Sequence, residues 1–220
     1  MSLLLGDWLA QKPFSLALSA GFFGFYAHCG VLLALEEAGL FPSAYSGASA
    51  GAIVAGLRSS GCDAKQMLEI LTHLQRRDFW DPGLGLGLLR GDRLRNLLDR
   101  LLLVSDFQSC CIPLSISVYD IFKRKTIALQ SGNLADAMYA SCAVPLLFQP
   151  IRIDGNWFVD GGIGDTWGLL GIPENCRVFC HCLPTSAVWS RGRKRKISLP
   201  EGENIACLKI DSLPAVSKEI

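Results

Sequence analysis

The sequence predicts an α/β fold, because two units of strand, turn and helix follow one another near its N-terminus. In the first unit, the apolar run at residues 14–19 is typical of a buried strand, a loop with glycines follows at 20–24, and a helix with apolar periodicity is expected over 26–38. In the second unit, residues 44–56 have the same form, with Ser49 at the turn. We therefore expect helices that pack on a central sheet.

The second turn carries the pattern G-x-S-x-G. Gly47 and Gly51 flank Ser49, and the residues between them, Ala48 and Ala50, are also small. Glycines admit the strained backbone of a nucleophile elbow, where strand and helix approach too closely for larger side chains. The unpaired amides at the start of the following helix would also favour a developing alkoxide on the serine. The alternative is an ordinary N-cap serine, and only partner residues elsewhere in the chain distinguish the two.

The loop at residues 20–24 lies between a strand and a helix, a geometry that holds an anion on backbone amides. One candidate anion is the phosphate of a dinucleotide. However, the loop has no complete G-x-G-x-x-G pattern, Phe22 and Phe23 are bulky, and no acidic ribose ligand follows at the expected distance. The other candidate is the oxyanion of an acyl-transfer intermediate, which we favour because a candidate elbow serine follows one strand–helix unit later.

Leucines dominate the segment that follows the elbow helix. Residues 63–77 are expected to form a helix. Over residues 81–91 glycines alternate with leucines, which predicts either a lid or interfacial loop, or a connector whose leucines pack inward; we favour the connector. Asp92 is expected to cap an amphipathic helix whose apolar face packs in the core. That face consists of Leu94, Leu97, Leu98, Leu101 and Leu102.

The second half of the chain adds strands and an acidic candidate. Asp160 lies at the end of an expected strand beside Gly161 and Gly162, a placement that favours chemistry over packing, although a turn aspartate is the alternative. Asn133 is expected to cap a short helix that ends near Ser141, before Pro145. The expected strands are 113–120, 126–129, 149–153, 157–159 and 177–183.

Length and composition favour one globular domain over residues 1–220. Half of the residues are apolar, yet no uninterrupted apolar run approaches the roughly 20 residues that span a bilayer. The first seven residues lack the basic region of a signal peptide, so we expect a cytoplasmic protein. A net charge of +1 argues against a nucleic-acid binder.

The nine cysteines have no regular spacing and are expected to be buried thiols rather than a disulfide framework. Cys176, Cys180, His181 and Cys182 could suggest a metal site. In a strand, however, Cys180 and Cys182 point to one face and His181 to the other, so we expect no metal there. The basic residues 191–196 are expected to form a solvated loop, with contact to anionic lipid head groups as the alternative.

Three segments, read together, resemble the patatin-like phospholipase family. The first, residues 16–39, begins Leu-Ala-Leu-Ser-Ala-Gly; the second is the elbow at 47–52; the third, 140–162, contains Ala-Ser-Cys-Ala-Val-Pro and ends in Asp-Gly-Gly. Their order and spacing agree with the family across about residues 15–165, and only residues 190–220 form a poorly defined tail.

The resemblance implies a three-layer α/β/α fold with a central, mostly parallel sheet and a Ser-Asp dyad instead of a triad. Carried over by position, Ser49 is the nucleophile and Asp160 the base that takes its proton. The amides of Ala20, Gly21 and Phe22 would form the oxyanion hole. The resemblance also implies a lipid acyl hydrolase of the phospholipase A or lysophospholipase type, which acts on a lipid or acyl ester through an acyl-enzyme. It implies no calcium or organic cofactor, and it is compatible with peripheral contact at a membrane surface.

The sequence departs from the family at two places. The family loop usually reads G-G-G-x-[RK]-G, whereas here Ala20 and a phenylalanine replace a glycine and the basic residue, and residues 165–168 replace the Asn and Pro that often follow D-G-G. Two alternatives remain open. One is another serine esterase or thioesterase with a triad of Ser49, Asp160 and His181, although His181 lies in an expected strand rather than on a loop. The other is a non-catalytic lipid-binding homologue.

Overall fold

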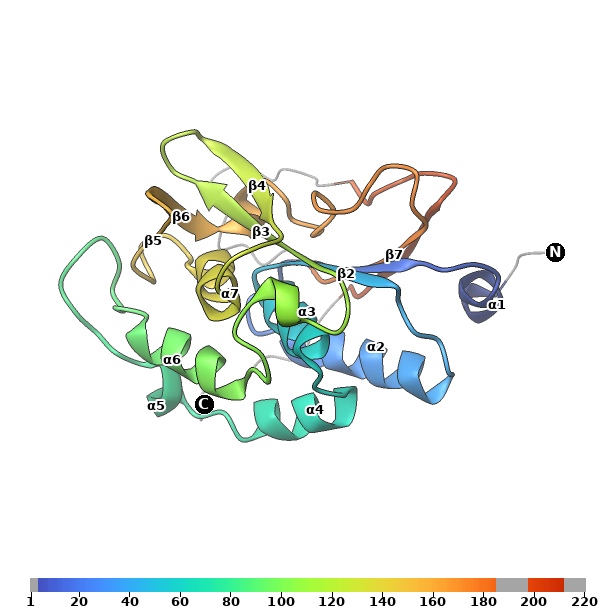
Figure 1. Ribbon diagram of the computed structural model, residues 1–220, viewed down its shortest axis with the longest axis horizontal. Helices are drawn as coiled ribbons and strands as arrows, with labels where there is room; N and C mark the ends of the chain where they lie inside the picture. Colours follow the sequence, from blue (N-terminus) through green and yellow to red (C-terminus); the bar gives the residue numbers. More distant parts are fainter. Residues whose placement is uncertain (1–3, 185–197, 212–220) are drawn as a thin grey trace.

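The structure is a computed structural model that describes residues 4–184 and 198–211. Its centre is an eight-stranded sheet in the order β5-β6-β3-β2-β1-β7-β8, and β4 pairs with β3 beside this path (Figure 1). From β3 to β8 along this order all neighbours are parallel, whereas β4, β5 and β6 pair antiparallel. The strands are β1 (Ser15–Leu18), β2 (Ala44–Ala48), β3 (Leu114–Asp120), β4 (Lys125–Leu129), β5 (Ile151–Ile153), β6 (Asn156–Asp160), β7 (Val178–Cys182) and β8 (Ile205–Lys209).

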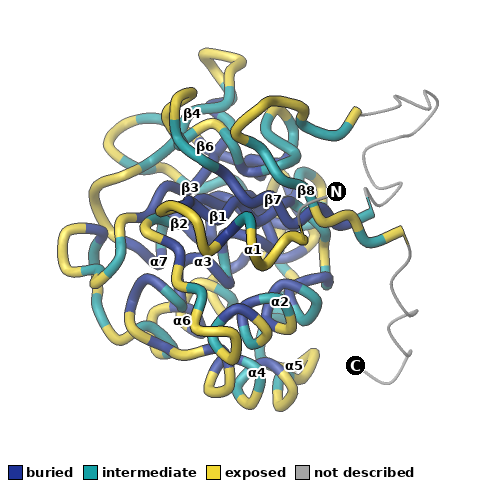
Figure 2. The backbone as a smooth tube through the Cα atoms, turned by 90° about the vertical axis from the view of Figure 1, so that its right-hand side faces the viewer, coloured by how far each residue is buried: buried dark blue, intermediate teal, exposed yellow. Residues whose placement is uncertain are grey.

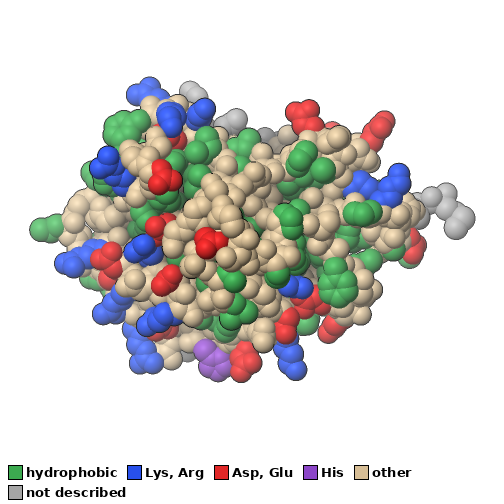
Figure 3. Space-filling view, in the orientation of Figure 1, with side chains coloured by type: hydrophobic (Ala, Val, Ile, Leu, Met, Phe, Trp, Pro, Cys, Tyr) green, Lys and Arg blue, Asp and Glu red, His purple; other side chains and the backbone are tan. Residues whose placement is uncertain are grey.

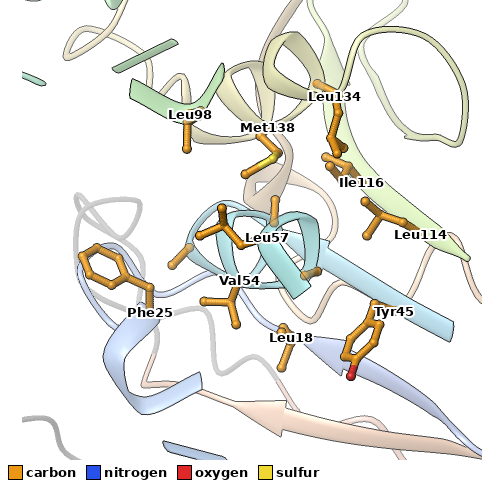
Figure 4. Packing of buried hydrophobic residues seen from close by; sticks show 14 of the residues in the cluster. Leu18, Phe25, Tyr45, Val54, Leu57, Leu98, Leu114, Ile116, Leu134 and Met138 are labelled. Carbon is orange, nitrogen blue, oxygen red and sulfur yellow. The ribbon is translucent and has the colours of Figure 1, made fainter. Parts of the chain in front are cut away.

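Helices gather on one face of this sheet and enclose the main hydrophobic core. Figure 2 shows the buried backbone concentrated in the sheet and in the helices that pack directly on it. In the core, Val54 and Leu57 of α3 lie between Leu18 of β1 and Met138 of α7 (Figure 4). The helices are α1 (Leu5–Ala10), α2 (Phe25–Glu37), α3 (Ala50–Ser60), α4 (Ala64–Thr72), α5 (Arg76–Phe79), α6 (Asp92–Leu101) and α7 (Leu134–Cys142), with 3₁₀ turns η1 (Phe107–Ser109) and η2 (Gly161–Ile163).

The other face of the sheet carries a second, smaller cluster. Ala17 of β1 and alternate residues of β7 point to this side and pack against Trp167, Leu169 and Ile172 of the segment after η2. Because the central strands are covered on both faces, every residue of β1 and β7 is buried, which explains why their sequences lack the alternation of a half-exposed strand. The predicted α/β fold with a central, mostly parallel sheet is therefore confirmed.

Local signals placed most elements correctly, and side-chain caps explain two differences. The helix expected over 63–77 divides into α4 and α5, because Asp78 caps the amide of Gln75 and begins a new helix there. The prediction that Asp92 caps α6 is wrong. The N-cap is Gly91, with φ of +87°, and the carboxylate of Asp81 accepts hydrogen bonds from the amides of Gly91 and Arg93.

The strand expected at 177–183 is present as β7, but it is not the last strand. β8 pairs parallel with β7 and lies in a stretch for which the sequence analysis predicted no element, as does α1. The basic residues 191–196 lie outside the described residues. Within the described parts of the chain, no helix is long and apolar enough to cross a membrane.

Candidate active site

Ser49 occupies the sharp turn between β2 and α3. Its backbone has φ of +52° and ψ of −118°, a strained conformation for a residue with a side chain. The flanking glycines are required sterically, since a Cβ atom on Gly47 would collide with the backbone of Gly51, and one on Gly51 with the carbonyl of Leu18. The hydroxyl of Ser49 makes no capping hydrogen bond to its own helix, so the N-cap interpretation does not describe this residue.

The hydroxyl of Ser49 instead donates a hydrogen bond to Asp160, with 2.7 Å between Oγ and Oδ2. Asp160 ends β6, which pairs with β3, the neighbour of the elbow strand β2, so the sheet brings together two residues that are 111 positions apart. The second carboxylate oxygen, Oδ1, accepts from the amide of Gly162 at 2.8 Å. Both side chains are buried, and the carboxylate is thereby fixed with one oxygen toward the serine.

Burial raises the pKa of Asp160 to about 7, and the hydrogen bonds from Ser49 and Gly162 oppose this increase only in part. A carboxylate with a pKa near neutrality can accept a proton from a hydroxyl and return it within one reaction cycle. The electrostatics of this pair are therefore compatible with a general base.

Two residues of α7 hold the backbone of Ser49, and the sequence analysis assigned no role to either. Ser141 Oγ accepts from the amide of Ser49 at 2.8 Å and donates to the carbonyl of Ser117 on β3 at 2.7 Å. The thiol of Cys142 donates to the carbonyl of Ser49 at 3.2 Å. A serine among small apolar residues of a helix predicts only packing. The one signal in the sequence that could have indicated a role for these two residues is their position in the Ala-Ser-Cys-Ala-Val-Pro segment.

The loop after β1 differs from the expected oxyanion site in one residue. The amide of Ala20 donates to the carbonyl of Thr166 at 2.8 Å, so it is occupied within the chain. For the amides of Gly21 and Phe22, the described residues provide no hydrogen-bond acceptor. Phe22 has φ of +52°, and a Cβ atom on Gly21 would collide with the side chain of Leu183. The loop therefore offers two amides rather than three.

The two buried histidines pair with each other and not with the serine or the aspartate. His28 Nδ1 lies 2.8 Å from His181 Nδ1, and His28 Nε2 lies 2.9 Å from the carbonyl of Ser19. Since a carbonyl only accepts, His28 carries its proton on Nε2 and His181 donates from Nδ1. Burial lowers the pKa of His28 to about 3 and that of His181 to about 4, so both rings are neutral. This geometry does not match a triad that includes His181.

Three thiols form the only cluster of metal-ligating side chains found among the described residues. Cys180, Cys182 and Cys207 lie with their Sγ atoms within 4.8 Å of one another, on the face of β7 and β8 away from the candidate dyad. Cys180 Sγ and Cys182 Sγ are 3.3 Å apart, and Cys207 donates to the carbonyl of Pro200. His181 lies on the opposite face, as predicted, and the strand β8 that supplies Cys207 was not predicted.

A cavity of about 210 Å³ lies beside Ser49 and is lined almost entirely by apolar side chains. One wall is the leucine face of α6, which the sequence analysis assigned to core packing. Other parts of the lining come from the loop after β1 and from the end of α7. The residues that line the cavity include Phe22, Phe23, Ile53, Leu71, Trp80, Leu94, Leu97, Leu98, Leu147 and Phe148. An acyl chain that entered this cavity would contact hydrocarbon along its whole length.

Comparison with known proteins agrees with this fold. Residues 16–170 match the family described as patatin-like phospholipase. The chain is similar to uncharacterized NTE family proteins of Mycobacterium bovis (Mb1092c) and Mycobacterium tuberculosis (Rv1063c), each 30% identical over 154 residues. The alignment covers 69% of this chain and 43% of each relative, so the matched region spans less than half of their length.

Two solved structures resemble the fold. VipD from Legionella pneumophila matches with a TM-score of 0.66 and 18% identity, over 80% of this chain and 51% of that chain. The type III effector protein ExoU matches with a TM-score of 0.54 and 18% identity, over 94% of this chain and 50% of that chain. Because the family match extends over residues 16–170, more than half of the sequence, the chain belongs to the patatin-like phospholipase family.

Proposed function

We propose that this protein is a lipid acyl hydrolase that cleaves carboxylic esters through an acyl-enzyme on Ser49, with Asp160 as the base. The observation that carries the proposal is the 2.7 Å hydrogen bond between Ser49 Oγ and Asp160 Oδ2 beside an apolar cavity. Membership of a phospholipase family supports the choice of a lipid ester as the substrate.

In the proposed reaction, Ser49 Oγ attacks the ester carbonyl carbon while its proton passes to Asp160. The amides of Gly21 and Phe22 donate to the oxyanion that forms. When the tetrahedral intermediate collapses, the bond to the alcohol breaks, and Asp160 gives its proton to the departing alkoxide. The acyl chain remains on Ser49 as an ester.

The second half of the reaction repeats these steps with water. A water molecule gives a proton to Asp160 and attacks the acyl carbonyl. Collapse of this intermediate releases the fatty acid, and the proton returns from Asp160 to Ser49 Oγ. A single carboxylate can serve both halves because burial holds its pKa at about 7, close to the pH at which it must accept and donate.

The test combines covalent labelling with turnover. Wild type, Ser49→Ala and Asp160→Asn are treated with a fluorophosphonate probe, and release of p-nitrophenol is measured from short and long acyl esters. Matched controls are Ser105→Ala and Asp154→Asn, which change the same residue types at exposed positions. We expect wild type and controls to react with the probe and turn over, and both site variants to do neither. A labelled Ser49→Ala variant, or a folded wild type that never hydrolyses an ester, would contradict the proposal.

His181→Ala separates the dyad from the alternative triad. Because His181 hydrogen-bonds to His28 and not to Asp160, we expect the folded variant to keep most of its turnover. The loss of a buried ring leaves a cavity and lowers stability, so the assay is run at low temperature with the folded fraction checked by circular dichroism. Turnover that disappears in the folded variant would favour the triad.

A further inference from the structure

Four leucines at one end of the molecule are exposed, and three of them belong to residues 81–91, where a connector with leucines that pack inward is expected from the sequence. Leu84, Leu86 and Leu88 belong to residues 81–90, here called the leucine loop, and Leu146 follows α7. Leu84 is fully exposed, and the exposed fractions of Leu86 and Leu146 are 74% and 78%. The connector interpretation is therefore wrong for these side chains. Neighbouring exposed leucines are unfavourable in water and mark a surface that meets another apolar phase.

The leucine loop is held in place by hydrogen bonds. It forms a hairpin closed by backbone bonds from Gly83 N to Leu88 O and from Arg90 N to Asp81 O. The side chain of Gln149 binds the tip of the hairpin: its Oε1 accepts a hydrogen bond from the amide of Leu86, and its Nε2 donates one to the carbonyl of Gly87, each at 2.8 Å. The exposed leucines are thus presented by a defined backbone.

The same backbone also forms a wall of the apolar cavity. Leu88 N donates to Leu146 O, and Leu89 N donates to Leu147 O, so the two segments run side by side. Leu88 and Leu146 are exposed, whereas their neighbours Leu89 and Leu147 line the cavity beside Ser49. In each of the two paired segments an exposed leucine is therefore followed directly by a leucine of the cavity wall, so these segments join the cavity to the exposed leucines.

The charges around the leucine loop suit a phospholipid head-group layer. Residues 76–93 contain the four arginines 76, 77, 90 and 93 and three aspartates. Two of the aspartates are engaged in capping: Asp81 accepts from the amides of Gly91 and Arg93, and Asp78 accepts from that of Gln75. Figure 3 shows hydrophobic side chains protruding at the end of the molecule where Figure 1 places this loop, with both basic and acidic side chains nearby.

We propose that the leucine loop and Leu146 insert into the surface of a phospholipid membrane, with the surrounding arginines at the level of the phosphates. This orientation would bring the cavity wall that contains Leu89 and Leu147 next to the membrane, with Leu88 and Leu146 on its outer side, and would shorten the path of an acyl chain from the lipid to the cavity. The choice of a lipid surface as the occupant rests on the proposed function. A second copy of the chain and a protein partner are the other occupants that the test distinguishes.

The test uses the full chain with Ser49→Ala, so that vesicles are not consumed. Co-sedimentation is measured with vesicles of phosphatidylcholine alone and of phosphatidylcholine mixed with phosphatidylglycerol. The loop variant carries Leu84→Ser, Leu86→Ser and Leu88→Ser. Its matched control carries Leu103→Ser and Leu170→Ser, which replace exposed leucines outside the loop. Because all these side chains are exposed, both variants should fold, which circular dichroism verifies.

We expect the parent protein and the control to bind vesicles, more tightly when phosphatidylglycerol is present and less tightly at high salt. The loop variant should lose about tenfold or more in vesicle affinity, because three leucines no longer leave water. Equal binding by the loop variant and the control would overturn the proposal. A second result would also overturn it: light scattering shows that the parent protein is a dimer and the loop variant a monomer, and neither protein binds vesicles.

Activity on a monomeric ester separates this proposal from the proposed function. The loop variant with an intact Ser49 should hydrolyse a short, water-soluble ester as fast as wild type and lose rate only on vesicle substrates. A protein that binds vesicles but never reacts with the fluorophosphonate probe would contradict the proposed function alone. A protein that reacts with the probe but does not bind vesicles would contradict the docking proposal alone.

Discussion

Ser49 Oγ lies 2.7 Å from Asp160 Oδ2, and each of the two residues is fixed by a separate backbone constraint. The strained turn between β2 and α3 directs the serine, and the amide of Gly162 directs the carboxylate. The pair is buried, so the charge of Asp160 in its basic form is poorly solvated. Two predictions about pH follow from this burial.

The rate of ester hydrolysis should depend on the protonation of Asp160. Because only the carboxylate can take a proton from Ser49, kcat/KM on a neutral short-chain ester should fall about tenfold per pH unit below the pKa of Asp160. That pKa is raised to about 7 by burial, so kcat/KM should reach its plateau above this value. The measurement is a pH–rate profile with the stability of the enzyme checked at each pH. A profile that levels off near the ordinary carboxyl pKa of 3.8 would show that Asp160 is not the base.

Asp160→Asn should stabilise the fold at alkaline pH. The pKa of Asp160 rises from 3.8 in the unfolded chain to about 7 in the folded protein, so the folded state binds the proton more tightly. Its contribution is therefore favourable below the unfolded pKa and is lost as the pH rises through about 7. At pH values above 7 the variant should exceed wild type by as much as about 4 kcal/mol in the free energy of unfolding, and the difference should shrink toward low pH. Urea unfolding at both ends of this range measures it, and a difference that is the same at both ends would contradict the prediction.

Ser141→Ala should lower kcat more than it raises KM. Its hydroxyl accepts from the amide of Ser49 and donates to the carbonyl of Ser117, so its loss leaves two buried backbone groups without partners at about 1–3 kcal/mol each. We expect a lower free energy of unfolding and a more mobile turn at Ser49. We expect kcat on a short ester to fall about tenfold or more, because small displacements at the reacting atom are costly. Ser105→Ala is the control, and an unchanged kcat in folded Ser141→Ala would limit the role of Ser141 to stability.

The candidate nucleophile and base could be predicted from the sequence because each lies in a turn with strict local requirements. The glycines around Ser49 are demanded by the approach of α3 to β1, and a Cβ on Gly161 would collide with the backbone of Ser117 on β3. Such constraints leave a pattern within a few residues. The distance between the two side chains could not be read locally, because it depends on the register of β6 against β3 and of β3 against β2.

Residues whose partners are distant in the chain escaped prediction. Asp81 caps α6 from ten residues before Gly91, and Ser141 looks like any small residue of a buried helix. The leucines of residues 81–90 illustrate the same limit, because the alternation of Gly and Leu does not say which side faces the protein. Pairing with residues 146–149 decides that question in the fold, and no local pattern encodes it.

Leu94→Trp should shorten the acyl chains that the enzyme accepts. Leu94 lines the apolar cavity from α6 and is only partly buried, so an indole at this position can replace part of the empty volume without displacing the core. A long acyl chain would then lose apolar contacts, each methylene removed from the cavity costing about 0.8 kcal/mol. We expect kcat/KM for long acyl esters to fall about tenfold or more and that for an acetyl ester to stay near the wild-type value.

The measurement is kcat/KM across a series of p-nitrophenyl esters of increasing chain length. Leu103→Trp is the control, because Leu103 is exposed and does not line the cavity. An equal loss for short and long esters would mean that the substitution disturbs the dyad itself, and an unchanged series would mean that the acyl chain does not enter this cavity.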